Sequence, residues 1–584
     1  MEDPGEGDQS GEESPTYGYF SDEDSSDCED SGDGTVGRTG SGESLNGPHP
    51  AAISSEGCGT ETREAVSQPP TVLHWVRMSA LRIHDNPALQ QALLDTQRRL
   101  RCVFIIDPWF IRGRIGENRC RFLLESLHDL DKKLRAYCSR LYVVQGQPIA
   151  AMEQLIRQWN VQQLTFQQDM EPYSQRLEES VAKVAKISGV EVSVSYLSAF
   201  PFTAHTLYHP AAMLAANGNK PILTQKAFRE LVPKLGAPTK PIAVPDPDSE
   251  VFSTKLYSEE DPDVGLYRIP TMSEMGFEDC SLYTNVWVGG ETEALRRLPL
   301  YCQLRSQNTD NTVDMLFDKS ALSPYVRFGC LSVRYFLWKT RAISSSNPAV
   351  ESVVRQLTQK LLNREFYFVV ASQVPNYDIT ENNPICLQLP WETDTSLLPL
   401  WREGKTGYPW IDAAMRQLRK EGWIHYYLRE SVAAFLTSGD LWISWVAGKD
   451  TFEELLLDYE PTVSCGLWMK SSCSTFLHGP IPYYCPITFG QKIDPKGQYI
   501  RTFCPELRNM PSEYIFSPWL APPHVQKAAN CIIGADYPNP MIDHTTAGAL
   551  CCERIRSILK SLHSLMPNLP QGLPVSTTPG SPSS

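Results

Sequence analysis

Tryptophan is the residue type in this chain that first raises a chemical question, because 13 of the 584 residues are Trp. A large π-system is oxidised relatively easily, so several indole rings in close series can carry an electron hole through a protein. Trp442 and Trp445 are three residues apart, a spacing that predicts two rings on one face of a helix. The alternative, which we expect for most of the tryptophans, is packing in a hydrophobic core.

The 16 cysteines do not form a metal-binding pattern. They include no CxxC pair and no Cys/His cluster at metal-ligand spacing. They stand in apolar runs such as Arg101-Cys-Val-Phe, which predicts reduced, buried thiols in an intracellular protein. We therefore expect neither a metal nor a disulfide framework.

The charge of the chain is concentrated at its start. Residues 1–64 contain 17 Asp/Glu and 2 Arg, and this segment accounts for the whole formal charge of −15. Residues 1–70 are rich in Gly, Ser, Asp, Glu and Pro, which predicts a disordered acidic tail. Ser21-Asp-Glu-Asp resembles an acidic-directed kinase site, and a plain solvated tail is the alternative. The near-neutral remainder neither requires nor excludes a nucleic-acid groove.

The start of the chain and its hydropathy predict no secretion signal and no membrane span. Residues 1–30 are acidic rather than basic and then apolar, as a signal peptide would be. The chain also has no run of 18 apolar residues.

Residues 71–200 show the alternation of an α/β domain. Short apolar runs predict strands at 72–76, 102–106, 141–144, 163–166 and 190–194. Helical patterns separate them, one beginning at Asp85-Asn-Pro-Ala-Leu with proline in its first turn and one from Cys120 to Leu130. This order predicts a doubly wound parallel sheet.

The rest of the chain changes character twice. Residues 201–290 are Pro-rich and irregular and are expected to form a connector. Residues 291–564 are expected to form an all-helical domain. In it, Ile411, Met415 and Leu418 follow helical spacing and Gly422 ends that helix. Residues 565–584, with Pro-Gly-Ser-Pro, are expected to form a flexible tail.

Several long motifs, in order along the chain, resemble the cryptochrome/photolyase family, closest to animal cryptochromes and (6-4) photolyases. The resemblance runs from about Thr71 to about Leu562. The motifs are His74-Trp-Val-Arg, Leu81-Arg-Ile-His-Asp-Asn-Pro-Ala-Leu, Trp287-Val-Gly-Gly-Glu-Thr-Glu-Ala-Leu, Leu322-Ser-Pro-Tyr-Val-Arg-Phe-Gly-Cys-Leu-Ser, Gly407-Tyr-Pro-Trp-Ile-Asp-Ala-Ala-Met-Arg-Gln-Leu, Glu421-Gly-Trp-Ile-His, Gly439-Asp-Leu-Trp-Ile-Ser-Trp and Asp494-Pro-Lys-Gly-Gln-Tyr-Ile-Arg.

The resemblance implies that the helical domain binds FAD. Ser320, Leu322 and Ser323 match the loop that meets the FAD phosphates, a role that suits the free N–H groups of a helix start. A plain N-cap role for Ser323 is the alternative. Arg364 matches an arginine near the phosphates, and Lys360 stands where animal members usually carry Gln. An ammonium group there would favour an anionic flavin or weaken the pocket.

The resemblance also assigns residues around the isoalloxazine ring. Arg429 and Asp458 match a buried ion pair beside the ring, which tunes its charge and redox state. Glu460 stands where Asp is usual. Ser464 matches the residue facing flavin N5, where Asn, Cys or Asp is usual, and Tyr426 takes the place of a histidine.

The resemblance gives four tryptophans a role in electron transfer. Trp468, Trp445 and Trp391 match the family's chain to the flavin, and Trp442 matches a fourth, outer member found in animal proteins. Core packing remains the alternative reading for each of them.

The pocket that holds DNA lesions in photolyases is altered. One aromatic wall is replaced by Asn363 and another by Lys470, which removes stacking surfaces for a flipped base. The two acid/base histidines of the (6-4) enzymes are replaced by Tyr426 and Glu430, and His425 matches the position before the first. These changes argue against DNA repair.

Three functions follow in order of expectation. The first is a cryptochrome that acts as a blue-light photoreceptor, a circadian signalling regulator, or both, with FAD reduced through the tryptophans. The second is a light-independent circadian repressor that binds a partner in the pocket, and the third is a (6-4) photolyase. Clock or signalling proteins are the expected partners, with weak or absent DNA binding, and the expected location is nucleus and cytoplasm. No residue decides whether an antenna chromophore is present.

Overall fold

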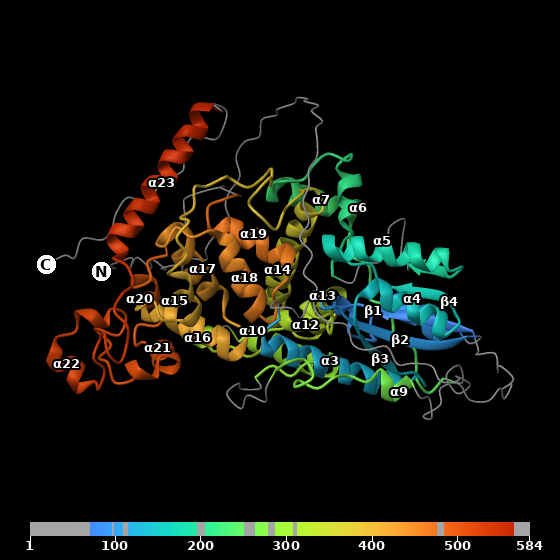
Figure 1. The fold of residues 1–584 in the computed structure, drawn as a ribbon. Helices are drawn as coiled ribbons and strands as arrows, with labels where there is room; N and C mark the ends of the chain where they lie inside the picture. The colour runs from blue at the N-terminus through green and yellow to red at the C-terminus, as the bar shows by residue number, and fades with distance from the viewer. Residues whose placement is uncertain are drawn as a thin grey trace, which may run out of the picture.

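A parallel sheet and the helices on its two faces make up the first part of the computed structural model (Figure 1). The strands are β1 (Thr71–Val76), β2 (Arg99–Ile106), β3 (Leu141–Gln145), β4 (Val161–Phe166) and β5 (Glu191–Val194), in the spatial order β3-β2-β1-β4-β5. All neighbouring strands are parallel. The predicted doubly wound α/β domain is therefore confirmed.

The structure describes most of the chain after residue 69. The described ranges are 70–95, 98–108, 115–194, 205–249, 263–277, 286–307, 312–475 and 484–565. The acidic tail predicted up to residue 70 and the tail predicted from residue 565 lie outside these ranges except for their single boundary residues.

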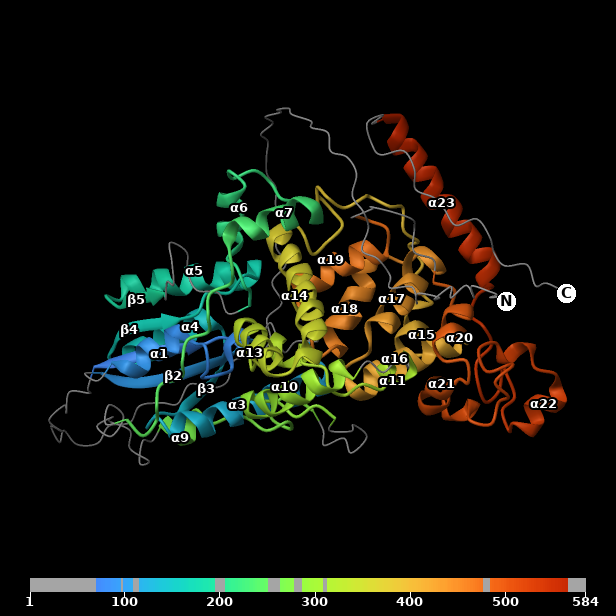
Figure 2. The same cartoon turned by 180° about the vertical axis from the view of Figure 1, so that it is seen from behind.

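Two helices cover each face of the sheet. On one face are α1 (Pro87–Leu94) and α3 (Glu117–Arg135), and on the other are α4 (Pro148–Gln158) and α5 (Pro172–Ile187). The view from behind shows α1 lying across the strands (Figure 2). The start of α1 follows the sequence signal, because Pro87 is its first residue and Asn86 accepts a hydrogen bond from Leu89 N at 3.1 Å.

After β5, the regular secondary structure of the described residues is helical. Their bounds are α6 (Pro210–Ala216), α7 (Gln225–Leu235), α9 (Asp263–Leu266), α10 (Glu291–Ser306), α11 (Thr312–Leu316), α12 (Ser323–Arg327), α13 (Val333–Ser346), α14 (Glu351–Ala371), α15 (Leu398–Glu403), α16 (Pro409–Glu421), α17 (Tyr426–Ala434), α18 (Trp445–Leu455), α19 (Pro461–Ser471), α20 (Thr488–Ile493), α21 (Gln498–Phe503), α22 (Pro523–Ala528) and α23 (His544–Leu565). A π-helix, η3, spans Phe435–Gly439, and short 3₁₀ helices are η1 (Met78–Ala80), η2 (Pro348–Val350), η4 (Pro505–Leu507) and η5 (Pro518–Leu520).

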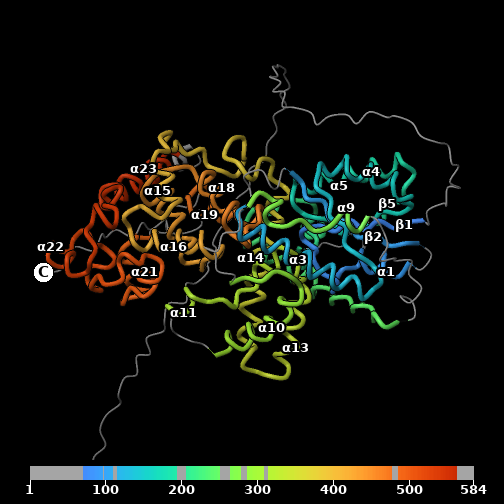
Figure 3. Tube along the Cα trace, turned by 60° about the horizontal axis from the view of Figure 1, so that its bottom comes forward, coloured from blue at the N-terminus to red at the C-terminus, as the bar shows by residue number. Residues whose placement is uncertain are grey.

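Two details of this region bear on the sequence predictions. The helix containing Ile411, Met415 and Leu418 ends as predicted, because Gly422 adopts the left-handed conformation with φ 72°. The segment 201–290, expected to be irregular, contains α6 and α7, and both pack on α14. Tube and ribbon views place α14 between the sheet and the helices α15, α16 and α18 (Figures 1 and 3).

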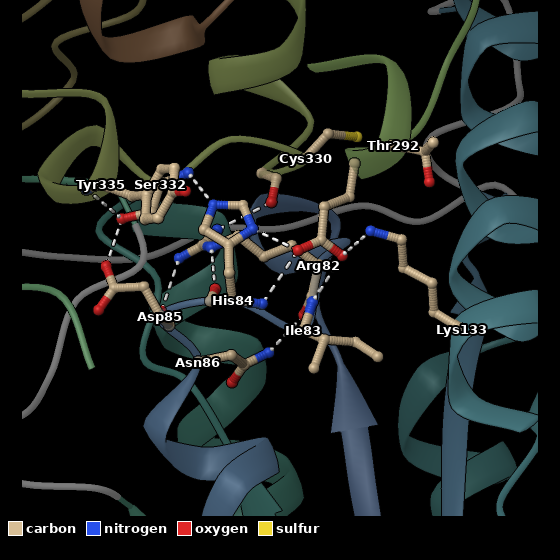
Figure 4. A network of polar contacts seen from close by, with 12 residues as sticks. Arg82, Ile83, His84, Asp85, Asn86, Lys133, Thr292, Cys330, Ser332 and Tyr335 are labelled. Atoms are coloured by element: carbon tan, nitrogen blue, oxygen red, sulfur yellow. Dashed lines mark hydrogen bonds and ion pairs between the residues drawn. The ribbon is translucent and has the colours of Figure 1, made fainter. Parts of the chain in front are cut away.

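A buried polar network joins the loop after β1 to the helical part (Figure 4). His84 Nδ1 donates to Glu291 at the start of α10, and His84 Nε2 accepts from Ser332 N at 3.1 Å. Burial lowers the pKa of His84 despite this carboxylate, so the ring is neutral and its single proton lies on Nδ1. Arg82 Nη1 donates to Gly329 O at 2.8 Å. The network thereby fixes the backbone that follows α12.

Candidate cofactor site

An ion pair joins the start of α17 to the loop before α19. Arg429 Nη2 lies 3.0 Å from Asp458 Oδ2, and Arg429 Nε donates to Ile424 O at 2.9 Å. Trp423 Nε1 donates to the same Oδ2 at 3.2 Å. Asp458 Oδ1, in contrast, is buried and has no hydrogen-bond partner within the described residues. The carboxylate is thus held on one side and open to a donor on the other.

A second ion pair lies two residues further on and was not foreseen as a pair. Arg364, on α14, donates from Nε and Nη2 to the two oxygens of Glu460 at 2.8 and 2.6 Å. Its third nitrogen, Nη1, donates to the carbonyl of His205. All of the guanidinium nitrogens are therefore engaged by protein, and Arg364 acts here as a partner of Glu460.

His205 connects this ion pair to the α/β domain. Its fully buried ring has Nδ1 3.4 Å from Glu460 Oε1 and Nε2 3.2 Å from Asp169 Oδ1, just after β4. Burial disfavours the imidazolium, but the two carboxylates prevail and raise the pKa of His205 to about 9. Burial also opposes ionisation of Glu460, yet Arg364 and His205 hold its pKa at about 2. The site therefore contains a charged triad at neutral pH.

Positive charge gathers around His425 from three elements. Burial, together with Arg305, Arg429 and Lys360, lowers the pKa of His425 to about 3. The side chain of Lys360 is solvent-accessible but surrounded by enough protein for burial to lower its pKa, an effect that Arg305 reinforces and Asp318 opposes. This arrangement suits a bound anion.

Arg305 is the functional candidate that the sequence reasoning missed. It stands in the last turn of α10, pairs with Asp318, and has a buried Nε without a hydrogen-bond partner among the described residues. No local pattern marks it, because only the packing of α10 beside α14 brings it near Lys360.

The predicted phosphate loop leads into the short helix α12. Leu322 is buried and is the residue before the helix, and Ser323 is its exposed first residue. Ser323 Oγ accepts from Trp423 Nε1 at 3.3 Å, so it contacts the residue that also binds Asp458. Ser320 Oγ is buried without a partner within the described part of the chain. The loop and the Arg429–Asp458 pair thus share one neighbour, Trp423.

Two further predicted residues lie on the adjoining helices. Ser464 is half-buried in the first turn of α19, where its N–H donates to Glu460 O at 2.8 Å. Tyr426, the first residue of α17, is 50% exposed and its ring centroid lies 4.4 Å from that of His425. Both are close in the chain to the ion pairs described above.

Two predicted electron-transfer tryptophans lie in the core of the helical domain. Trp468, on α19, is 4% exposed and packs edge-on against Phe452 at 5.1 Å. Trp445 is the first residue of α18 and is fully buried. Both rings belong to one continuous hydrophobic core.

The positions of the other two tryptophans differ from the predicted geometry. Trp391 is half-buried and packs on the same core, with its ring centroid 5.1 Å from that of Trp442. Trp442 and Trp445 do not share a helix face, because Trp442 precedes α18 in a turn and has φ 54°. Trp442 is also only 1% exposed, since α23 packs over it. The ring series therefore ends beneath a helix.

The residues expected to replace the lesion-binding walls and the second acid/base histidine have their own contacts. Asn363 Oδ1 accepts from Gln359 Nε2 at 3.2 Å on α14, and Glu430 accepts from Tyr484 OH at 2.6 Å. Lys470 is half-buried near the end of α19. No aromatic ring stands at these three positions.

Two surface cavities lie away from these residues. One of about 450 Å³ lies between α4 and α5 and is lined by residues including Gln147, Tyr173 and Arg176. The other, of about 370 Å³, lies between the start of α3 and the end of α18. Neither contains a predicted site residue, and the chemistry of the ion pairs and unpartnered atoms locates the candidate site better.

Two absences hold for the described residues. They contain no group of three or more His, Cys, Asp or Glu side chains that could hold a metal ion. Within the same ranges, the helices are too short or too polar to cross a membrane.

The hydrogen-bonding atoms and charges of this site suit FAD. Buried polar atoms almost always have partners, so the unpartnered Asp458 Oδ1, Ser320 Oγ and Arg305 Nε call for a ligand. FAD has N–H and O–H donors for the two oxygens and phosphate oxygens for the guanidinium. Arg305 and Lys360 supply positive charge of the kind that a diphosphate requires.

Comparison with known proteins agrees with this fit. Residues 72–246 match the DNA photolyase family, and residues 357–557 match the FAD binding domain of DNA photolyase. The chain is 43% identical to Cryptochrome-2 of Gallus gallus over 84% of each chain. It is 42% identical to Cryptochrome-1 of Mus musculus, over 84% of this chain and 80% of the relative.

Solved structures give the same assignment. A Synechocystis cryptochrome superposes with a TM-score of 0.72 at 26% identity, covering 83% of this chain and 99% of the other. A class III photolyase of Agrobacterium tumefaciens shares the fold, with a TM-score of 0.71 at 24% identity over 86% of this chain and 100% of the other. With its parallel α/β domain, its helical FAD-binding domain and its extensive identity to animal cryptochromes, the chain belongs to the cryptochrome/photolyase family of flavoproteins.

Proposed function

We propose that the chain binds FAD in the helical domain and acts as a cryptochrome, a blue-light photoreceptor and signalling regulator. When bound, FAD supplies light absorption and accepts an electron. Trp468, Trp445 and Trp391 supply that electron in sequence, and Trp442 extends the series. The observation that carries this proposal is that Trp468 and Trp445 lie in one hydrophobic core, that Trp391 packs against this core, and that the ring centroids of Trp391 and Trp442 are 5.1 Å apart.

The ion pairs have supporting roles in this proposal. Arg429 fixes Asp458 with one oxygen left for the cofactor, and Arg364 with His205 keeps Glu460 ionised. Fixed charges beside a flavin set the free energy of adding an electron to it. Of the positive groups around His425, Arg429 is the one expected beside the ring, where it would favour the anionic form of a reduced flavin.

A spectroscopic experiment tests the proposal. The full chain is purified in darkness with added FAD, and its visible spectrum is recorded before and during blue illumination. We expect a flavin spectrum that bleaches in light, and bleaching at least about tenfold slower in Trp468→Phe, since the first electron donor is lost. Trp338→Phe, a half-buried tryptophan on α13 outside the series, serves as the matched control.

A light-independent regulator is the second candidate. It is favoured by Lys360, because burial first and then the nearby Arg305 lower its pKa and so disfavour an ammonium group at this place in the pocket. In that case the altered pocket binds a protein segment, and the chain binds no flavin even with FAD in excess. Bleaching at the same rate in Trp468→Phe and wild type would likewise exclude the electron-transfer role.

DNA repair is the candidate with least support. Asn363, Lys470 and Glu430 replace the aromatic and histidine groups that hold and protonate a lesion in the family's enzymes. We propose protein partners rather than DNA as the ligands of this face. Repair of cyclobutane or (6-4) lesions above a no-enzyme control would contradict that proposal.

A further inference from the structure

The last helix covers the end of the tryptophan series. Trp442 lies in a buried cluster with Cys473, Cys551 and Ile555, the last two from α23. In both ribbon views α23 runs along the outer side of the helical domain (Figures 1 and 2). This helix also packs on η3, the π-helix that ends three residues before Trp442. The attachment of α23 therefore depends on the surface formed by this tryptophan.

A charged residue of α23 faces the same ring. The guanidinium carbon of Arg554 lies 5.3 Å from the centroid of Trp442. Arg554 Nη2 also lies 2.7 Å from Glu392 Oε1, and Glu392 N donates to Trp442 O at 3.0 Å. Arg554 thus joins α23 to both the ring and the backbone of the segment that carries Trp391.

The ring of Trp442 is held in one position. Its backbone is left-handed with φ 54°, an unfavourable conformation for a bulky residue that surrounding contacts must maintain. Trp442 N donates to Thr437 O at 2.9 Å, and the indole Nε1 donates to Pro390 O at 2.8 Å. An amide carbonyl is a very weak base, so it would not remove the indole proton from an oxidised ring. A positive charge formed on Trp442 would persist next to Arg554.

We propose that the Trp442–Arg554 contact is a redox-sensitive latch that holds α23 in the dark and weakens when Trp442 loses an electron. This proposal rests on the proposed electron transfer. The electron passes from Trp442 through Trp391, Trp445 and Trp468 to the flavin. Bound FAD would supply the acceptor for this electron, Trp442 becomes a radical cation, and no bond or proton changes at this step.

The sign of the effect follows from the charges. A neutral indole attracts a guanidinium through its quadrupole, whereas an oxidised indole carries a full positive charge and repels it. Glu392 reduces this repulsion but is 47% exposed, and solvent weakens its contribution. Because coupling is reciprocal, Arg554 must also disfavour the charge on Trp442, so removing Arg554 should prolong the tryptophan radical.

The test follows α23 and the radical in the same sample. Full-length protein with FAD is kept dark or under continuous blue light. Hydrogen exchange is measured for peptides covering residues 545–561, and transient absorption records the tryptophan radical. In wild type we expect light to speed exchange in α23 by about three- to tenfold, the range set by loss of a cation–π contact plus repulsion. Peptides of α4, which belongs to the α/β domain, should not change.

Variants separate the latch from general loosening. Arg554→Gln should abolish the light-dependent increase while the radical forms and lasts longer than in wild type. Arg554→Lys keeps the charge and should retain most of the increase. Trp442→Phe should also lose the light-dependent increase in exchange.

Two results would overturn the latch. If the tryptophan radical forms and hydrogen exchange in α23 does not change, the latch is contradicted but the proposed photoreceptor function is not. The same conclusion follows if light speeds exchange equally in wild type and Arg554→Gln. Absence of any tryptophan radical in wild type contradicts the proposed function and the latch together.

Discussion

Arg364 and Glu460 form a two-point ion pair between α14 and the residue that precedes α19, with Nε–Oε2 and Nη2–Oε1 distances of 2.8 and 2.6 Å. Their side chains are only 13% and 7% exposed, so solvent screens the pair weakly. The same carboxylate also faces His205, which belongs to a segment that reaches the α/β domain through Asp169. Glu460 therefore links the two domains at the candidate flavin site.

Replacing Glu460 by Gln should strongly destabilise the protein. The change leaves Arg364 and the protonated His205 buried without their shared anion, a loss worth about 3–5 kcal/mol for a broken buried pair. Urea denaturation of wild type and variant, both with FAD, measures the difference in the free energy of unfolding.

A surface pair on the same helix provides the control for this change. Glu351 and Arg355 on α14 are 66% and 71% exposed, so Glu351→Gln should change the free energy of unfolding by less than about 1 kcal/mol. If Glu460→Gln were no more destabilising than Glu351→Gln, the pair would not join the domains as described.

Stability should fall as pH rises from neutral through about 9. The pKa of His205 is raised to about 9 in the folded protein from an ordinary value near 6.5. The folded state therefore holds a proton that the unfolded state has lost in this interval, so the stabilisation is full below pH 6.5 and is lost as pH passes 9. The shift corresponds to about 3 kcal/mol at most.

Comparison with His205→Gln isolates this contribution. The difference in unfolding free energy between wild type and variant should shrink over the same pH interval. Other buried groups also titrate there, because burial raises the pKa of Glu178 to about 8 and that of Glu365 to about 7. The effect of Glu365 is common to both proteins, whereas His205 lowers the pKa of Glu178, so its removal also moves that titration. A constant difference between pH 6 and 10 would show that His205 is neutral.

The sequence predicted the elements well where local physics decides them. Runs of apolar residues identified the strands of the sheet, and Asn86-Pro87 and Gly422 marked the ends of two helices correctly. The position of Trp442 was not predictable in this way, because the π-helix η3 shifts the backbone before it and leaves Trp442 in a turn. Local spacing holds only while the helix remains regular.

The charge arrangement of the site depended on tertiary structure in the same way. Arg364 and Glu460 are 96 residues apart, and Arg305 meets Lys360 only because α10 packs beside α14. The resemblance identified Arg364 and Glu460 as site residues but not as partners. His205 and Arg305 were missed because no periodicity or motif marked either one.

Arg305→Gln should weaken FAD binding. Arg305 has a buried Nε without a partner among the described residues and contributes to the positive group around His425. Losing a hydrogen bond from a charged group to a phosphate should cost about 10- to 100-fold in affinity. Fluorescence titration of the flavin-free protein with FAD at low and high salt measures the change, and the variant should show the weaker salt dependence.

An arginine away from the site provides the control for this titration. Arg355 lies on the exposed side of α14 in an ion pair with Glu351, so Arg355→Gln should bind FAD like wild type. Equal weakening in both variants would point to general instability, and no weakening in Arg305→Gln would remove this residue from the cofactor site.

Gly448→Ala should disturb the first tryptophan of the series. A Cβ atom at this position on α18 would lie 2.3 and 2.5 Å from Trp468 ring atoms and 2.7 Å from Leu436 Cδ2. These separations are well below van der Waals contact, and Trp468 is buried against Phe452, so the ring must move. We expect a loss of about 1–3 kcal/mol in the free energy of unfolding. Light-driven bleaching should slow as well, because electron transfer depends steeply on ring position.

A second glycine separates crowding from the change of residue type. At Gly265 in α9, no atom of the described residues outside the adjoining stretch of the same helix lies within 4 Å of the place that an alanine methyl group would occupy, and the backbone is not left-handed. Gly265→Ala should therefore leave bleaching unchanged. Its effect on stability should be within about 1 kcal/mol, since Ala is the better helix former. If Gly448→Ala and Gly265→Ala had the same bleaching rate and the same free energy of unfolding, Trp468 would have room to adjust. The packed position of Trp468 would then not determine the rate of electron transfer.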